Sequence, residues 1–148
     1  MKKLLLLLLF VPLVGFGQQT YVPDDNFENY LEVMGLGDGI ALNDSVLTGN
    51  INTVTTLNID NLNIYDLTGI EDFTALIELH CTHNQLTSLD VSQNTYLIDL
   101  RCQDNQLTSL DVSANTFLEY LFCFSNQLTS LDVSNNSTLI YLYSQSNQ

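Results

Sequence analysis

Hydrophobic and polar positions recur together in the second half of the chain, with a period of 21 residues. The frame LIELHC begins at Leu76, and related frames follow at 97, 118 and 139. The connecting stretches are nearly identical, reading LTSLDVSQNTYL, LTSLDVSANTFL and LTSLDVSNNSTL. A degenerate copy begins at residue 54, so repeats start at 54, 76, 97, 118 and 139, and the last is incomplete. A period in this range predicts a solenoid of stacked coils.

The alternation inside each frame predicts a short strand. Leu79 and Cys81 fall on one side of an extended chain and His80 on the other, so the first two point inward. One coil has an apolar edge that only a neighbouring coil can cover. Stacking therefore predicts a parallel sheet on the concave face, with short turns and extended segments on the convex face.

The frame Leu-x-x-Leu-x-Cys-x-x-Asn-x-Leu, from Leu76 to Leu86, resembles the signature of leucine-rich repeats. The resemblance covers residues 54–148, and the segment from Leu67 to Leu76 is similar to the repeats of internalin-like secreted bacterial proteins. It implies a leucine-rich-repeat solenoid, of the α/β class by convention but with little helix. It also implies adhesion or surface recognition as the function.

Residues 18–53 do not repeat, and they predict an N-terminal cap. Pro23-Asp24-Asp25-Asn26 is a helix-start signal, and apolar residues then recur at helical spacing up to Met34. We expect a helix over about 24–34, ended by Gly35, with a loop region behind it. The stretch VPDDNFENYLEVMG also resembles the helical cap that precedes internalin-like arrays.

The first 17 residues have the pattern of a secretory signal peptide, with Lys2 and Lys3 before an apolar run that is too short to span a bilayer. We therefore expect a secreted or cell-surface protein that is not membrane-spanning. Cleavage would leave Arg101 as the one Lys or Arg against 17 carboxylates. Such a charge excludes nucleic acid as a natural partner.

Three rows of recurring residues are predicted to be structural because they keep phase with the repeat. Cysteines stand at one position, where the last coil has Ser144, so we interpret them as small buried side chains rather than disulfides. Asparagines stand where the chain leaves each strand, and an inward amide can satisfy the backbone groups there. Asp90, Asp111 and Asp132 are interpreted as solvated and bonded to nearby amides, with calcium binding as the alternative. The structural ladder comprises Cys81, Cys102, Cys123, Asn84, Asn105, Asn126 and Asn147.

Function is expected where the repeat varies, at the outward positions of the sheet. These are the third, fifth and seventh residues of each frame, so Thr82 is expected to point outward. Its C-terminal half is aromatic, and large exposed apolar patches are typical of interfaces. Arg101, beside Phe122, is expected to stack on that ring and to hold a charged ligand group. The alternative is aromatic packing that only stabilises the sheet. The candidate ligand-binding residues are Arg101, Tyr120, Phe122, Phe124, Tyr141 and Tyr143.

No catalytic constellation emerges, and we predict a protein that is not an enzyme and needs no cofactor or metal. His80 and Cys81 diverge, which disfavours a zinc site, and the carboxylates of Glu78 and Asp99 are interpreted as solvated. A protein partner is the leading hypothesis. A glycan stacked on the aromatic residues is the first alternative. The second is a fragment of a longer repeat protein that self-associates through its uncapped C-terminal coil.

Overall fold

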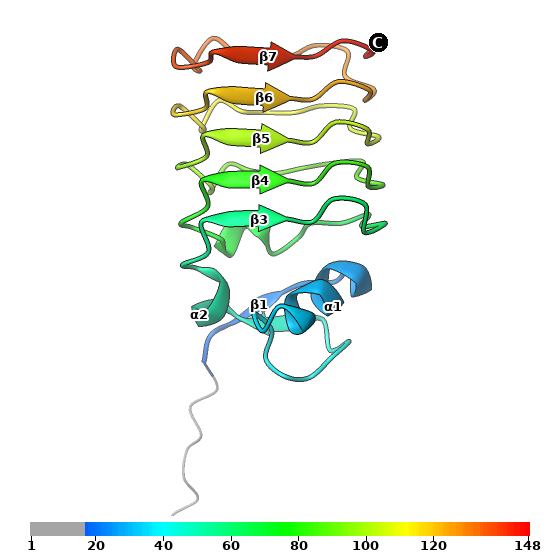
Figure 1. Cartoon of the computed structure of the whole chain (residues 1–148), viewed down its shortest axis with the longest axis vertical. Helices are drawn as coiled ribbons and strands as arrows, with labels where there is room; N and C mark the ends of the chain where they lie inside the picture. Colours follow the sequence, from blue (N-terminus) through cyan, green and yellow to red (C-terminus); the bar gives the residue numbers. More distant parts are fainter. Residues whose placement is uncertain (1–16) are drawn as a thin grey trace, which may run out of the picture.

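The computed structural model describes residues 17–148, so the predicted signal peptide falls, apart from Gly17, outside the described residues. Figure 1 shows a stack of parallel strands above a smaller N-terminal unit that contains two helices. None of the helices within residues 17–148 has the length and apolarity needed to cross a membrane.

The stack is a five-stranded parallel sheet in the order β3-β4-β5-β6-β7. Its strands are β3 (Thr56–Asn58), β4 (Glu78–His80), β5 (Asp99–Arg101), β6 (Tyr120–Phe122) and β7 (Tyr141–Tyr143). The middle leucines pair along the stack, Leu57 with Leu79 and Leu79 with Leu100. This register follows the sequence repeat and confirms the predicted parallel solenoid with little helix.

Each strand is only three residues long, which corrects one expectation about the outward positions. The sequence pattern placed Thr82 outward, on an extended strand. In the structure the strand ends at His80, and Thr82 is buried. Its backbone N–H donates to the Asp60 carboxylate at 2.7 Å, and its hydroxyl donates to the same carboxylate. Alternation therefore stops predicting side-chain direction once the chain begins to turn.

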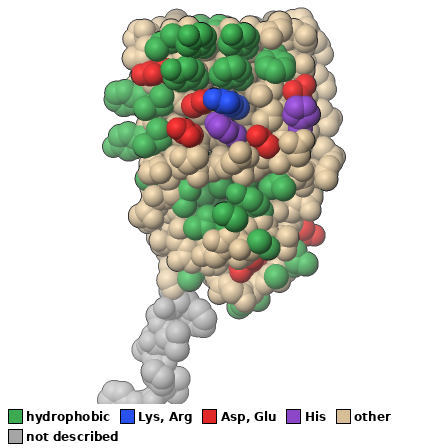
Figure 2. Space-filling view, viewed as in Figure 1, with side chains coloured by type: hydrophobic (Ala, Val, Ile, Leu, Met, Phe, Trp, Pro, Cys, Tyr) green, Lys and Arg blue, Asp and Glu red, His purple; other side chains and the backbone are tan. Residues whose placement is uncertain are grey.

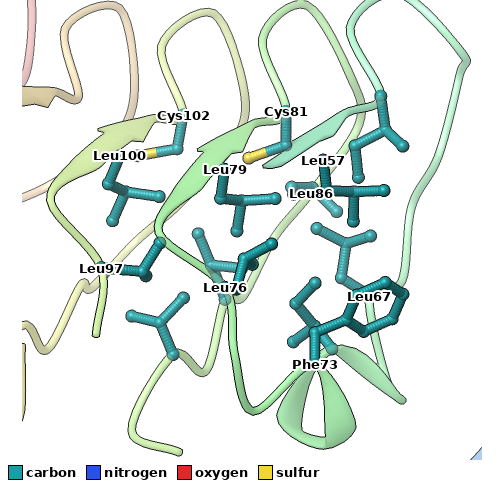
Figure 3. Close-up of a cluster of buried hydrophobic side chains, with 14 of the residues drawn as sticks. Leu57, Leu67, Phe73, Leu76, Leu79, Cys81, Leu86, Leu97, Leu100 and Cys102 are labelled. Atoms are coloured by element: carbon teal, nitrogen blue, oxygen red, sulfur yellow. The ribbon is translucent and has the colours of Figure 1, made fainter. Parts of the chain in front are cut away.

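The core lies between the sheet and the returning segments of each coil (Figure 3). Leu79 and Leu100 point inward from their strands and are fully buried, as are Cys81 and Cys102. Burial of one such leucine contributes roughly 1.5–3 kcal/mol. Neighbouring coils supply that burial to each other, which explains why leucine recurs at the same places in every coil.

Asparagine side chains join successive coils at the point where the chain leaves the sheet. The Asn105 amide oxygen accepts from Leu86 N–H at 3.0 Å, and its nitrogen donates to the carbonyl of Cys81 at 2.9 Å. Asn84, Asn126 and Asn147 repeat this pattern with their own preceding coils. The first coil has Leu62 at this position, and Asn84 accepts from the Leu62 N–H as well.

The N-terminal unit contains more regular structure than the sequence pattern indicated. The helix α1 (Asp25–Val33) lies within the predicted range. The stretch expected to be a loop contains strand β2 (Ser45–Leu47), antiparallel to β1 (Gln19–Tyr21), and helix α2 (Thr48–Ile51). Three- and four-residue elements carry too little periodicity to be recognised in a sequence.

The N-terminal unit is joined to the first coil by buried contacts. One Asp24 carboxylate oxygen caps α1 by accepting from the N–H groups of Asn26 and Phe27. The other accepts from the N–H of Tyr65, at 2.8 Å. Phe27 also packs on Phe73, which follows the short 3-10 helix η1 (Ile70–Asp72), with ring centroids 6.2 Å apart. These contacts are suited to a terminal cap, a role that stays a prediction.

Candidate binding face of the sheet

The outward side chains of β6 and β7 form stacked aromatic pairs. The ring centroids of Tyr120 and Tyr141 lie 5.5 Å apart and those of Phe122 and Tyr143 lie 4.9 Å apart, with 11° between the ring planes in both pairs. The pairs form because parallel register places equivalent positions of successive coils side by side. Figure 2 shows hydrophobic side chains gathered over these strands, with charged groups over the strands that precede them.

Phe124 completes this set, although it lies two residues beyond the end of β6. Its side chain is partly buried. Within residues 17–148, ring stacking joins the other four aromatic residues in pairs but does not include Phe124. We call the five residues the aromatic patch: Tyr120, Phe122, Phe124, Tyr141 and Tyr143. Its centre is the pair of stacks, and Phe124 lies at the side where the chain leaves the sheet.

Arg101 extends one stack by a third layer. Its guanidinium carbon lies 5.1 Å from the Phe122 ring centroid, a cation–π distance, so it continues the column of Phe122 and Tyr143. The same guanidinium donates to the Asp99 carboxylate from Nη2 at 2.8 Å and from Nε at 3.1 Å. These hydrogen bonds raise the pKa of Arg101 above its ordinary value. The charge expected to hold a ligand is thus already paired within its own strand.

The carboxylates at the polar end of the sheet differ from one another in environment. Asp99 was expected to be solvated, and this was wrong, because the Arg101 guanidinium covers it and only 9% of the residue is exposed. His80 Nε2 lies 3.9 Å from the same carboxylate. Cys81 points into the core and is fully buried (Figure 3), whereas His80 is partly exposed, so the two diverge.

Burial determines the pKa of the cysteine thiols, and hydrogen bonding determines the pKa of the aspartate carboxylates in the repeat. Burial raises the pKa of the Cys81 and Cys102 thiols well above their ordinary value, and that of Cys123 to about 11. Such thiols are protonated and unreactive at neutral pH. Asp90 accepts from the Ser92 N–H at 2.9 Å, and this hydrogen bond lowers the pKa of Asp90. Asp111 and Asp132 repeat the arrangement with Ser113 and Ser134.

A further acidic cluster lies in the N-terminal unit. Carboxylate oxygens of Asp25, Glu28 and Asp44 lie within 4.8 Å of one another. The buried Glu28 carboxylate accepts from the backbone N–H groups of Asn43 and Asp44, which fastens that loop to α1. Glu28 therefore already has a structural role.

The sequence pattern missed an apolar groove at the flank of the sheet, where the chain enters the strands. The groove has a volume of about 530 Å³ and includes Ile77, Ile98, Tyr96 and Phe117 in its lining. Tyr96 and Phe117 are 60% and 55% exposed. The available signal was the position before each frame's first leucine, which changes from alanine to tyrosine, phenylalanine and threonine over successive coils. Alternation assigns outward positions only within the strands, and these residues precede them.

The geometry defines a leucine-rich-repeat solenoid, with coils of 21 residues joined by an asparagine ladder. No protein-family model matches the chain. It is 44% identical over 75 residues to Internalin J of Listeria monocytogenes serotype 4b, strain F2365, a match that covers 51% of this chain and 8% of that protein. The chain is thus internalin-like, similar to bacterial leucine-rich-repeat proteins of that group.

Solved structures agree with that class. The functional domain of InlJ from Listeria monocytogenes, which includes a cysteine ladder, superimposes with a TM-score of 0.77 at 42% identity. That match covers 88% of this chain and 29% of the other. The internalin InlF of the same species gives a TM-score of 0.68 at 22% identity, covering 80% of this chain and 35% of that one, which shows a shared fold. The chain thus spans well under half of the length of each of these three relatives.

Proposed function

We propose that this protein is a non-enzymatic recognition module that binds a protein partner through the aromatic patch on the concave sheet face. The internalin-like fold suggests a protein-binding or adhesion module. The observation that carries the proposal is the stacked pairs on β6 and β7, where four aromatic rings occupy adjacent outward positions. Aromatic residues dominate the binding energy of protein interfaces.

The stacking of the rings, which covers their faces, favours a protein partner over a glycan. Arg101 covers one side of the Phe122 ring and Tyr143 stacks on it as well, at 4.9 Å. Sugar binding by stacking needs an open ring face. A protein surface can pack apolar groups against ring edges as well as faces. Glycan binding is therefore the second candidate, supported by the outermost rings, Tyr141 and Tyr143, which are both exposed.

A paired array experiment tests this proposal. The folded protein is applied to an array of extracellular protein domains and to a glycan array, next to the double variant Phe122→Ser/Tyr143→Ser. We expect protein hits that the double variant weakens at least about tenfold, as loss of two central aromatic residues does at other interfaces. Tyr65→Ser, which changes an exposed tyrosine far from the patch, is the matched control.

Three outcomes decide between the hypotheses. Binding to protein domains that depends on Phe122 and Tyr143 supports the proposal. Patch-dependent binding to glycans alone replaces it with the second candidate. Hits that the double variant retains at full strength refute a role for the patch and leave sheet stabilisation as its explanation.

Location and self-association belong to the same proposal. The leader-like residues 1–17 support secretion or display at the cell surface.

Self-association through β7 stays a prediction, motivated by the exposure of Leu142 and Tyr143 on the last strand. Light scattering over a range of protein concentrations tests it, and a constant monomer mass would remove it.

A further inference from the structure

The groove at the flank of the sheet is separate from the aromatic patch. It lies where the chain enters the strands, and its wall comes from Ile77 and Ile98, the residues immediately before β4 and β5. Tyr96 and Phe117 stand beside them on successive coils and project from the surface. Figure 2 shows hydrophobic side chains projecting at this margin of the sheet. The volume of about 530 Å³ is in the range of sites that hold one large side chain or a small ligand.

The repeat itself does not require these side chains. The equivalent positions hold Ala75 in the preceding coil and Thr138 in the following coil, and the sheet continues through both. An aromatic side chain that is more than half exposed contributes little to core packing and leaves apolar surface in water. The groove thus has the apolar walls and the open side that a docking side chain needs.

Charge determines what kind of partner fits. Glu119 lines the groove and places a carboxylate beside the apolar wall. In residues 17–148 the only Lys or Arg is Arg101, whose guanidinium is held by Asp99, while 17 carboxylates share the same chain. A second copy of this protein would bring the same negative sign to Glu119, which disfavours it as the occupant of this groove. A positively charged partner would be attracted to the groove and to its surroundings.

We propose that this groove docks a cationic peptide segment of a partner protein, inserting one bulky apolar side chain between Tyr96 and Phe117 while flanking Lys or Arg residues face Glu119. The apolar side chain provides burial against Ile77 and Ile98. The flanking cations provide orientation and attraction. The site is distinct from the aromatic patch, so the chain has two recognition surfaces.

Synthetic peptides of defined sequence test the proposal. The probes are the capped pentapeptides Lys-Lys-Phe-Lys-Lys, Lys-Lys-Ser-Lys-Lys and Glu-Glu-Phe-Glu-Glu, titrated into ¹⁵N-labelled protein at low salt. We expect the first to shift the amide signals of Ile77, Ile98 and Phe117, and the other two to bind at least about tenfold more weakly. Added salt should weaken binding, because the charges lie at an exposed surface.

Variants separate the apolar and the charged contributions. Phe117→Ser should weaken the binding of Lys-Lys-Phe-Lys-Lys at least about tenfold, and Tyr96→Ser serves the same purpose if that variant fails to fold. Glu119→Gln should weaken the same peptide while leaving Glu-Glu-Phe-Glu-Glu unaffected or tighter. Tyr65→Ser removes an equally exposed aromatic residue elsewhere and should change nothing.

Several results would overturn the proposal. Equal binding of the serine peptide would reduce the effect to charge alone, and equal binding of the glutamate peptide would reduce it to apolar contact alone. Signals that shift at Tyr141 and Tyr143 instead of the flank would move the site to the aromatic patch. No binding of Lys-Lys-Phe-Lys-Lys would remove it. A dimer that Phe117→Ser dissociates in light scattering would make a second copy the occupant.

Discussion

Replacing Asn105 with alanine tests the asparagine ladder at the middle of the stack. The wild-type amide oxygen accepts from Leu86 N–H at 3.0 Å, and the amide nitrogen donates to the carbonyls of Cys81 and Cys102. Both carbonyls keep a second donor in the variant, because Asn84 also donates to Cys81 and Asn126 to Cys102. The buried Leu86 N–H is left without its partner. An orphaned buried donor costs about 1–3 kcal/mol.

The assay is urea unfolding followed by far-UV circular dichroism, comparing the free energy of unfolding of wild type and variant. Asn135→Ala is the matched control, since that side chain is exposed and makes one long bond of 3.4 Å to the Ser113 carbonyl. We expect Asn105→Ala to lose about 1–3 kcal/mol more than the control. A loss no larger than that of Asn135→Ala would refute the assignment of the ladder as a backbone partner.

Three further predictions concern the same coils. Ser125 has a φ of 52°, a left-handed conformation that asparagine tolerates better than serine. Ser125→Asn should therefore raise the free energy of unfolding by about 0.5–1 kcal/mol. A decrease in the urea midpoint would contradict this. Burial raises the pKa of the Cys123 thiol to about 11, so stability falls as pH rises above the ordinary thiol pKa, because the unfolded chain loses its proton first. Cys123→Ala should make that slope less steep between pH 8 and 11, while Cys81 and Cys102 retain their own contributions, and an unchanged slope would count against it. Leu100→Ala should cost about 2–5 kcal/mol in urea unfolding, and the same change at the exposed Leu142 should cost much less; equal losses would contradict the burial pattern.

Most of the solenoid could be predicted from the sequence because its local and long-range signals coincide. The coils that begin at 76, 97 and 118 place leucine, cysteine and asparagine at fixed intervals, and the observed pairing of Leu79 with Leu100 and of Leu100 with Leu121 follows those intervals. The helix α1 was predictable for a similar reason, since its capping residues and apolar spacing agree. The strands β1 and β2 were missed because their pairing is antiparallel and separated by a loop, with three residues each.

The candidate site was predictable only as far as alternation holds. It placed Tyr120, Phe122, Tyr141 and Tyr143 on one face, and the structure pairs them there. It could not indicate that Arg101 turns back to Asp99, since that depends on side-chain conformation within one strand. It also overlooked Tyr96 and Phe117, because they precede the strands and are exposed through the shape of the coil rather than through alternation.

We propose that the repeated residues maintain the solenoid and that the varied residues of the sheet face bind a partner. A saturation mutagenesis library displayed on cells, sorted once for protease resistance and once for binding to a protein domain identified on the array, tests it most directly. We predict that substitutions at Asn105 and Leu100 fail both sorts, whereas substitutions at Phe122 and Tyr143 pass the first and fail the second. If substitutions at Phe122 and Tyr143 fail the protease sort as Leu100 does, or pass both sorts, the aromatic patch is not the binding surface.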